Sequence, residues 1–207
     1  MSKNNVVEIL DILHKKYPEA KCELDYHNIY ELSIAVMLSA QTTDKAVNKV
    51  TPLLFDKYKN YFELANAHFN DVYQIIKIIG LANTKARNII KMSKEVVERY
   101  NGILPNDFDL LITLPGIGRK TANVILSEGF HIQRIAVDTH VERVTKRLQL
   151  VDYELNTLQT EEKLMEIIPQ NRWHEAHHLF IFFGRYLCSS RNPKCDECPF
   201  NNNCLKK

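Results

Sequence analysis

Four cysteines near the end of the chain are spaced so that their side chains can meet at one point. They form a C-x6-C-x2-C-x5-C array in a short segment that contains prolines: Cys188, Cys195, Cys198 and Cys204. Thiolates so close in sequence converge only if a metal centre binds them, either a zinc ion or an iron–sulfur cluster. Zinc ribbons usually carry two C-x2-C pairs, and this array has one, which favours iron–sulfur. The array therefore predicts a metal centre.

A second group of residues, 114–118, has the sequence Leu-Pro-Gly-Ile-Gly and separates two predicted helices. Its two glycines, Gly116 and Gly118, permit a tight turn and a close approach to a ligand. The helix that follows directs free N–H groups at that ligand, and a phosphate oxygen is a suitable acceptor. Such a hairpin would grip a nucleic-acid backbone without reading bases. The alternative is an ordinary helix–helix turn.

Lys120 lies in the first turn of the helix after the hairpin, beside Arg119. The helix dipole and the neighbouring cation both disfavour a charged ammonium, and a neutral amine can form a Schiff base with a sugar C1′ or an aldehyde. Asp138 precedes another predicted helix and could stabilise an oxocarbenium ion or move protons. The alternatives are a phosphate-binding or solvated lysine, and an aspartate that only caps its helix.

A competing motif lies at residues 174–178, His-Glu-Ala-His-His. Read as H-E-x-x-H, it would place His174 and His178 on one helix face as zinc ligands, with Glu175 as the base of a hydrolase. No further histidine follows, and no later glutamate-bearing helix supplies a third ligand. We therefore weight this alternative low.

The elements that must position these groups are predicted to be helices almost throughout. Tyr30–Ala40 is apolar nearly all round, which is typical of a helix buried in the centre of a domain. Pro52 predicts a kink or an early break in a helix that begins near Asp44. Asp71 and Thr84 are expected to act as N-caps of the two helices that follow. No strand alternation or repeat is found.

Composition excludes several classes of protein. The 207 residues are 45% hydrophobic and 25% charged, with a formal net charge of +2, so a nucleic-acid partner would need a local basic surface. The N-terminus lacks the apolar run of a signal peptide, and no apolar segment is long enough to cross a membrane. Five cysteines, of which only Cys22 lies outside the array, argue against a secreted disulfide framework and for a reducing cytoplasm. We read Cys22 as a structural thiol.

Four motifs in this order, SAQTTD (39–44), LPGIGRKTAN (114–123), AVDTH (136–140) and the cysteine array, closely resemble the endonuclease III family of DNA repair glycosylases. The resemblance covers essentially the whole chain. It implies an all-α, two-domain helix-hairpin-helix fold with the substrate cleft between the domains. Residues 22–133 would form a six-helix domain containing the hairpin at about 108–128. Residues 1–21 plus 134–207 would form the domain whose four cysteines hold one [4Fe–4S] cluster.

The resemblance also implies the reaction. A damaged pyrimidine is flipped out of duplex DNA, Lys120 attacks its C1′ with support from Asp138, and the base leaves. The resulting Schiff base allows β-elimination, which cuts the strand 3′ to the abasic site. The related adenine-specific mismatch glycosylases typically lack this lysine, so Lys120 indicates the bifunctional glycosylase and lyase branch. The expected substrates are oxidised pyrimidines.

Several residues are expected to contact DNA. By resemblance, Gln41 and Leu81 fill the gap in the base stack, although Leu81 could simply pack in its loop. Arg191 and Lys194 would form a basic knob, although ordinary surface charge is the commoner role of such residues. The remaining expected contacts are Leu114, Gly116, Gly118, Arg119, Thr139 and His140. A DNA-binding module without catalysis is the alternative function. We expect a monomer in the cytoplasm, associated with DNA and not with membranes.

Overall fold

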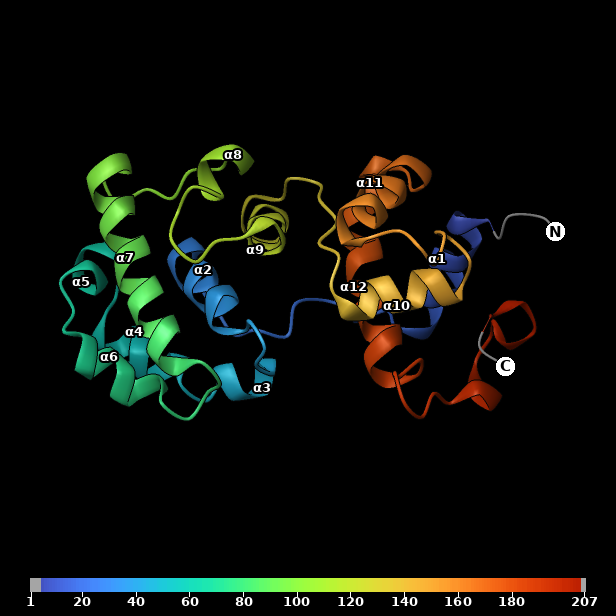
Figure 1. Cartoon of the computed structure of the whole chain (residues 1–207), viewed down its shortest axis with the longest axis horizontal. Coiled ribbons are helices and arrows are strands. Elements are labelled where there is room, and N and C mark those ends of the chain that lie inside the picture. Colours follow the sequence, from blue (N-terminus) through green and yellow to red (C-terminus); the bar gives the residue numbers. More distant parts are fainter. Residues whose placement is uncertain (1–4, 206–207) are drawn as a thin grey trace. The chain divides into compact units, whose positions relative to one another are not determined.

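The computed structural model describes residues 5–205, and within that range every regular element is a helix (Figure 1). The chain divides into two compact units. The first, which we call the hairpin unit, comprises Glu23–Ile132. The second, the cysteine unit, comprises the described residues of Met1–Cys22 and Gln133–Lys207. The chain thus leaves the cysteine unit after its first helix and returns to it after the hairpin unit is complete.

The hairpin unit is built around one helix that is buried on every side. Tyr30 and all residues from Leu32 to Leu38 of α2 are buried, as the apolar pattern predicts, and only Glu31 between them is partly exposed. The long helix α7 packs against α5 and α6, while α2 contacts α7, α9 and η1 (Figure 1). The elements are α2 (Ile29–Leu38), α3 (Asp44–Val47), α4 (Thr51–Lys57), α5 (Tyr61–Ala65), α6 (Phe69–Ile76), α7 (Ala82–Tyr100), α8 (Phe108–Leu111), α9 (Arg119–Val124) and the π-helix η1 (Ile125–Gly129).

Some helices of this unit begin with a side-chain cap and others do not. The predicted break at Pro52 is confirmed, because α3 ends at Val47 and Pro52 lies in the first turn of α4, where its missing N–H costs no bond. The predicted caps at Asp71 and Thr84 are wrong. Helix α6 begins at Phe69, so Asp71 lies inside its first turn and pairs with Lys57 at 3.1 Å.

Helix α7 begins before Thr84, immediately after Leu81, whose backbone is left-handed and whose side chain makes no cap. The first helical hydrogen bond runs from Lys85 N to Leu81 O at 3.0 Å, so the helix starts without a capping hydroxyl.

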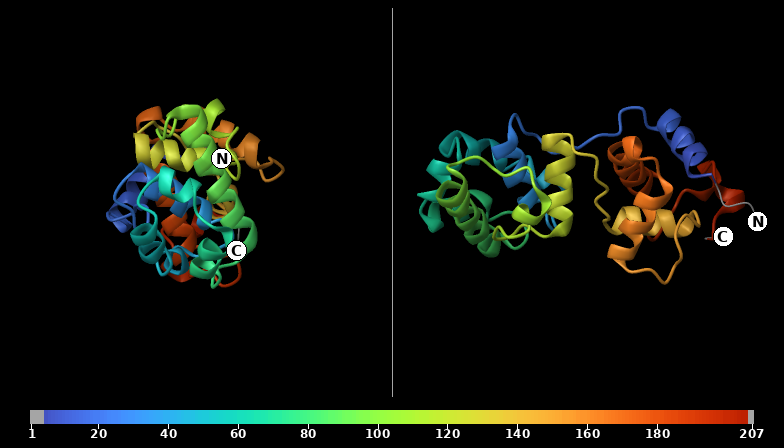
Figure 2. Two further views of the ribbon diagram at one scale, coloured as in Figure 1. Left: turned by 90° about the vertical axis from the view of Figure 1, so that its left-hand side faces the viewer. Right: turned by 90° about the horizontal axis from the view of Figure 1, so that it is seen from above.

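The cysteine unit joins the two ends of the chain. Its first helix, α1, contacts α12, the last α-helix of the described chain. The right-hand view of Figure 2 shows the blue N-terminal helix near the red C-terminal segment. Leu10 and Leu13 of α1 are fully buried beside Phe180 and Phe183, and each buried leucine contributes about 1.5–3 kcal/mol. The elements are α1 (Val6–Lys16), α10 (Thr139–Arg147), α11 (Thr157–Ile167), the 3-10 turn η2 (Gln170–Arg172), α12 (Trp173–Tyr186) and the 3-10 turns η3 (Cys195–Glu197) and η4 (Asn201–Asn203).

A search of residues 5–205 finds no helix with both the length and the apolar character that crossing a bilayer requires.

Candidate active site and metal centre

The hairpin is a rigid turn between α8 and α9. Leu114 and Ile117 are 2% and 4% exposed, so the turn is anchored in the core at two points. Its backbone bonds run from Leu114 N to Leu111 O (3.0 Å) and from Ile117 N to Leu114 O (3.1 Å). The Arg119 guanidinium lies 5.0 Å from the centre of the Phe108 ring and so connects the two helices.

The two hairpin glycines are required for different reasons. Gly116 has a φ of +81°, and a Cβ there would lie 2.8 Å from Met37 Cε and 2.9 Å from Asn88 Cβ. The fold itself therefore demands glycine at 116. Gly118 has a φ of −93°, and a Cβ there would meet no atom within 4 Å. Nothing in the described protein requires glycine at 118, so the open space lies in front of the hairpin.

Lys120 occupies the exposed first turn of α9, next to Arg119 and two residues after Gly118. The helix is firmly seated behind it, because Ala122 and Asn123 are completely buried. The helix then widens into the π-helix η1, a form that is frequent at functional sites. The lysine is thus presented outward by a helix whose opposite face lies in the core.

Asp138 caps α10, as predicted. Its Oδ1 accepts hydrogen bonds from the backbone N–H groups of His140 (2.8 Å) and Val141 (2.9 Å). The three residues before it, 135–137, are buried, and Asp138 itself has an extended backbone. Both capping bonds use one carboxylate oxygen. The capping interpretation is therefore confirmed, and it leaves the carboxylate half-buried at the start of a helix.

Two further residues around Asp138 belong to the expected DNA-contact set. Thr139 is exposed, and His140 is half-buried with its Nδ1 3.1 Å from Arg143 Nη2. Burial lowers the pKa of His140, and the Arg143 and Arg185 charges lower it further, against the opposing effect of the Asp138 carboxylate. His140 is therefore neutral at pH 7.

The other two expected DNA contacts of the hairpin unit share an unusual backbone. Gln41 and Leu81 have φ values of 55° and 59°, and both side chains are exposed. They come from different loops, one after α2 and one before α7. Each presents a side chain from a left-handed backbone, which few residues other than glycine and asparagine adopt readily.

The four cysteines of the array surround one cavity. Its space measures about 280 Å³, including the part that opens to solvent, and the lining includes every member of the array. Cys188 follows α12, Cys195 begins η3, Cys198 ends it and Cys204 follows η4. The remaining lining residues are Arg147, Leu187, Pro193 and Asn201. Four thiols around a mostly apolar space fit a cubane iron–sulfur cluster.

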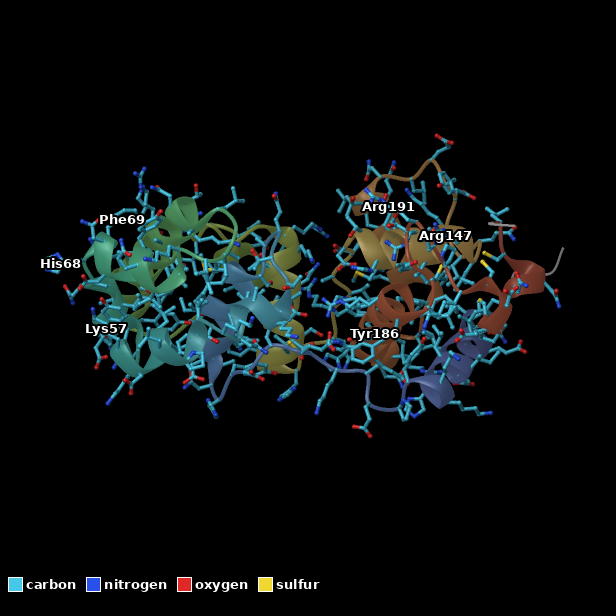
Figure 3. The ribbon with its side chains drawn as sticks, turned by 90° about the horizontal axis from the view of Figure 1, so that it is seen from below. Lys57, His68, Phe69, Arg147, Tyr186 and Arg191 are labelled. Carbon is cyan, nitrogen blue, oxygen red and sulfur yellow. The ribbon has the colours of Figure 1, made fainter. Side chains whose placement is uncertain are left out.

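The electrostatics of this cavity agree with an anionic cluster. Burial raises the pKa of the Cys198 thiol, and the nearby thiolates of Cys188, Cys204 and Cys195 raise it further, against a lowering backbone hydrogen bond from Phe200. Thiolates repel one another in an apolar space, so bound metal cations would stabilise them there. Arg147 supports them, because its Nη1 donates to Cys188 Sγ at 3.2 Å (Figure 3). The residues present therefore fit the cluster.

Comparison with known proteins covers both units. Residues 34–170 match the model of the HhH-GPD superfamily base excision DNA repair proteins, and residues 188–204 match the iron–sulfur binding domain of endonuclease III. Endonuclease III of Bacillus subtilis strain 168 is 48% identical over 94% of this chain and 89% of its own length. Endonuclease III of Escherichia coli strain K12 is 42% identical over 100% of this chain and 98% of its own length.

The chain belongs to the endonuclease III family. A trapped endonuclease III–DNA covalent intermediate aligns with a TM-score of 0.95 and 46% identity, covering 99% of this chain and 96% of that one. The all-helical hairpin fold with a C-terminal iron–sulfur loop is thereby confirmed. As a member of this family the protein is a base excision repair DNA glycosylase and abasic-site lyase that carries an iron–sulfur cluster.

Family membership removes the zinc hydrolase alternative, and the geometry agrees. In H-E-x-x-H hydrolases the glutamate must be available as a base, but Glu175 is held by Arg172 Nε at 2.7 Å and His14 Nδ1 at 2.9 Å. His177 and His178 are each 4% exposed, which is typical of core histidines.

Arg191 and Lys194 are exposed in the loop after Cys188. This position allows either the basic knob or ordinary surface charge.

Sequence reasoning missed two arginines of α10. Arg147 donates to Ser189 O (2.8 Å) and Ser190 O (3.1 Å) in addition to Cys188 Sγ. Arg143 donates to Cys188 O (3.1 Å) and Gly184 O (2.9 Å). Their spacing of four residues on one helix face was the available signal. It was ambiguous, because such spacing is common on exposed helices.

Proposed function

We propose that this enzyme removes oxidised pyrimidines from duplex DNA and cuts the strand 3′ to the resulting abasic site through a Schiff base on Lys120. One observation carries the assignment of the nucleophile. Lys120 stands exposed in the first turn of α9, two residues after Gly118, and a Cβ at Gly118 would meet no protein atom within 4 Å. An amine presented beside a backbone-binding turn can reach a sugar carbon that has been drawn out of the duplex.

The proposed chemistry has two stages. The lone pair of Lys120 Nζ attacks C1′ while the N-glycosidic bond breaks, and the base leaves with the bonding electrons and gains a proton. The sugar ring then opens to a protonated imine. Loss of a proton from C2′ and departure of the 3′ phosphate complete the β-elimination, and water releases the enzyme. Asp138 supports the first stage, because a carboxylate stabilises the positive charge that develops on the sugar.

The proposed DNA interface spreads over both units. Gly116, Gly118 and the N–H groups that follow would hold a phosphate, with Leu114 anchoring the turn and Arg119 adding charge. Gln41 and Leu81 would occupy the gap left by the flipped base. Thr139, His140, Arg191 and Lys194 would contact the backbone elsewhere. Because these contacts involve phosphates, binding should weaken steeply with salt.

We further propose that the enzyme acts as a monomer on DNA in the cytoplasm. Four of the five cysteines lie in the cluster loop, a distribution that is not typical of a secreted disulfide-bonded protein and that supports a reducing compartment. Sedimentation of the purified holoenzyme, alone and with a short duplex, tests the monomer: a single species at one mass per duplex is expected.

Borohydride trapping tests the nucleophile. Purified protein is mixed with a duplex containing one thymine glycol, and sodium borohydride is added to reduce any imine to a stable amine. We expect a covalent protein–DNA adduct with the native enzyme and none with Lys120→Ala. No adduct on this duplex, or on a duplex with a plain abasic site, would contradict the lyase mechanism and leave a single-function glycosylase or a binding module.

Asp138→Asn separates catalysis from capping. The amide oxygen can still accept the hydrogen bonds from the His140 and Val141 N–H groups, so the free energy of unfolding should change by less than about 1 kcal/mol. The excision rate should fall at least about 100-fold, because the stabilising charge is removed. An unchanged excision rate would reduce Asp138 to a helix cap.

A further inference from the structure

Four non-glycine residues of the hairpin unit have left-handed backbones, and two of them, Gln41 and Leu81, are expected to contact DNA; Asn101 and His131 are the others. Gln41 (φ 55°) and Leu81 (φ 59°) are both left-handed, which costs non-glycine residues roughly 1–2 kcal/mol each. The Leu81 side chain is also 55% exposed, so it gains little from burial. Such conformations persist only when surrounding contacts enforce them, and they cluster at functional sites.

The loops that carry these residues lie against each other. We call them the first loop (39–43) and the second loop (79–81). A Cβ built on Gly80 would lie 3.6 Å from Gln41 O and 3.7 Å from Thr42 Oγ1, ordinary contact distances. The backbone at Gly80, next to Leu81, therefore lies close enough to Gln41 O that a single added carbon would touch it, although the two loops are far apart in sequence.

One residue is bonded to both loops. The backbone N–H of Lys85 donates to Leu81 O at 3.0 Å, which is the first helical bond of α7. Its side-chain Nζ donates to Thr42 Oγ1 at 2.7 Å, across a sequence separation of 43 residues. Lys85 thus ties the second loop through its main chain and the first loop through its side chain.

The lysine is unusual for its burial as well as its partners. Lys85 is 5% exposed, and burial lowers its pKa because the charged ammonium is desolvated. A methionine would fill similar space without desolvating an ammonium. The contribution of Lys85 is therefore directional: it places Thr42, and with it Gln41, at a set position relative to Leu81.

We propose that Lys85 is a positioning residue that holds Gln41 and Leu81 at one fixed separation, so that both side chains enter the base stack as a single preformed wedge. The inference rests on the proposed function, because a wedge matters only if a base is extruded. Extrusion of the base costs a few kcal/mol of lost pairing and stacking. If the two loops are already ordered before DNA binds, the contacts of the wedge offset this cost without first having to offset the entropy of ordering the loops.

The test compares a reaction that needs extrusion with one that does not. Excision of thymine glycol from a duplex is measured with enzyme in excess, and strand cleavage is measured on single-stranded DNA with a preformed abasic site. The variants are Lys85→Met, Thr42→Val and the double variant. Lys94→Met, an exposed lysine of the same helix, is the matched control. A 2-aminopurine opposite the lesion reports wedge insertion by its fluorescence.

Each single variant is expected to slow excision roughly tenfold and to reduce the fluorescence change, while single-strand cleavage stays within about twofold. The double variant should be no slower than the slower single variant, because each substitution by itself already removes the hydrogen bond between Lys85 and Thr42. It should also melt near the native temperature, since an apolar pair of similar shape replaces a satisfied polar pair. Lys94→Met should match the native enzyme on both substrates.

Three results would overturn the inference. Equal losses of rate on both substrates would mean that Lys85 stabilises the fold in general. An unchanged excision rate would mean that the two loops keep their positions without the hydrogen bond from Lys85 to Thr42. A drop in affinity for undamaged duplex, with a shallower salt dependence, would make Lys85 a phosphate contact instead. Should the native enzyme itself fail on both substrates, the proposed function fails, which is distinguishable from a failure of the variants alone.

Discussion

The hairpin at 114–118 and the cysteine loop at 188–204 are both short, irregular and exposed, yet they are stabilised in opposite ways. The hairpin is anchored by Leu114 and Ile117 in the core and by the close packing of Gly116. The cysteine loop contributes mainly Cys188 and Phe200 to its core, the latter with its ring 5.7 Å from that of Phe183.

The difference lies in what each loop uses instead of regular secondary structure. The hairpin uses packing that the polypeptide supplies by itself. The cysteine loop uses ligand bonds to a cluster and hydrogen bonds from Arg147 to Cys188, Ser189 and Ser190. A loop that can bury little apolar surface needs a metal or cross-link to stay in one conformation. Disruption of packing should therefore affect the hairpin, and disruption of ligation should affect the cysteine loop.

Loss of one cluster ligand should have the largest effect. Cys198→Ala leaves three thiolates around the cavity, and we expect loss of iron and of the visible absorbance, with a destabilisation above about 4 kcal/mol. Hydrogen exchange should accelerate throughout 188–204 and much less in the hairpin. Cys22→Ala is the matched control and should retain the full iron content. Retention of iron by the Cys198 variant would contradict a four-cysteine site.

Gly116→Ala should be the most damaging change in the hairpin. The new methyl group would meet Met37 Cε and Asn88 Cβ at under 3 Å, on a backbone with positive φ. We expect a destabilisation of about 2–4 kcal/mol from overpacking and backbone strain, measured by denaturant unfolding. Iron content should be unaffected. Loss of iron in this variant would show that the two loops are not independently stabilised.

Arg147→Met should weaken the cysteine loop without removing a ligand. The variant leaves Ser189 O and Ser190 O without their guanidinium donor and removes the positive charge beside Cys188 Sγ. We expect a destabilisation of about 1–3 kcal/mol. Iron should be present initially but should be released faster to a chelator than from the native protein. Equal release rates would assign loop stability to the cluster alone.

Gly118→Ala should have the smallest effect on stability, within about 0.5 kcal/mol, because the added methyl meets no atom and φ is already favourable. Duplex affinity should nevertheless fall, since the methyl group would stand where a phosphate approaches. Fluorescence anisotropy with a labelled duplex measures this affinity, and Gly116→Ala provides the contrast. A stable variant with native affinity would remove Gly118 from the DNA interface.

Local sequence signals predicted much of this molecule correctly. The cysteine array, the Leu-Pro-Gly-Ile-Gly turn, the Asp138 cap and the break before Pro52 each involve residues close in sequence, so spacing alone encodes their geometry. The caps expected at Asp71 and Thr84 were wrong. Helix α6 begins at Phe69 and α7 at Ala82, so both residues lie inside the first turn of their helices, and neither helix start has a side-chain cap for the sequence to signal.

The sequence by itself determined the class of metal site, the hairpin, the family and the candidate nucleophile Lys120, because each depends on residue type and short spacing. Only the tertiary structure showed that Lys85 is buried against Thr42 and that Arg147 donates to Cys188 Sγ. These partners lie 43 and 41 residues apart. No local propensity specifies such pairs, since a lysine or arginine on a helix is solvated unless the packing of distant segments encloses it.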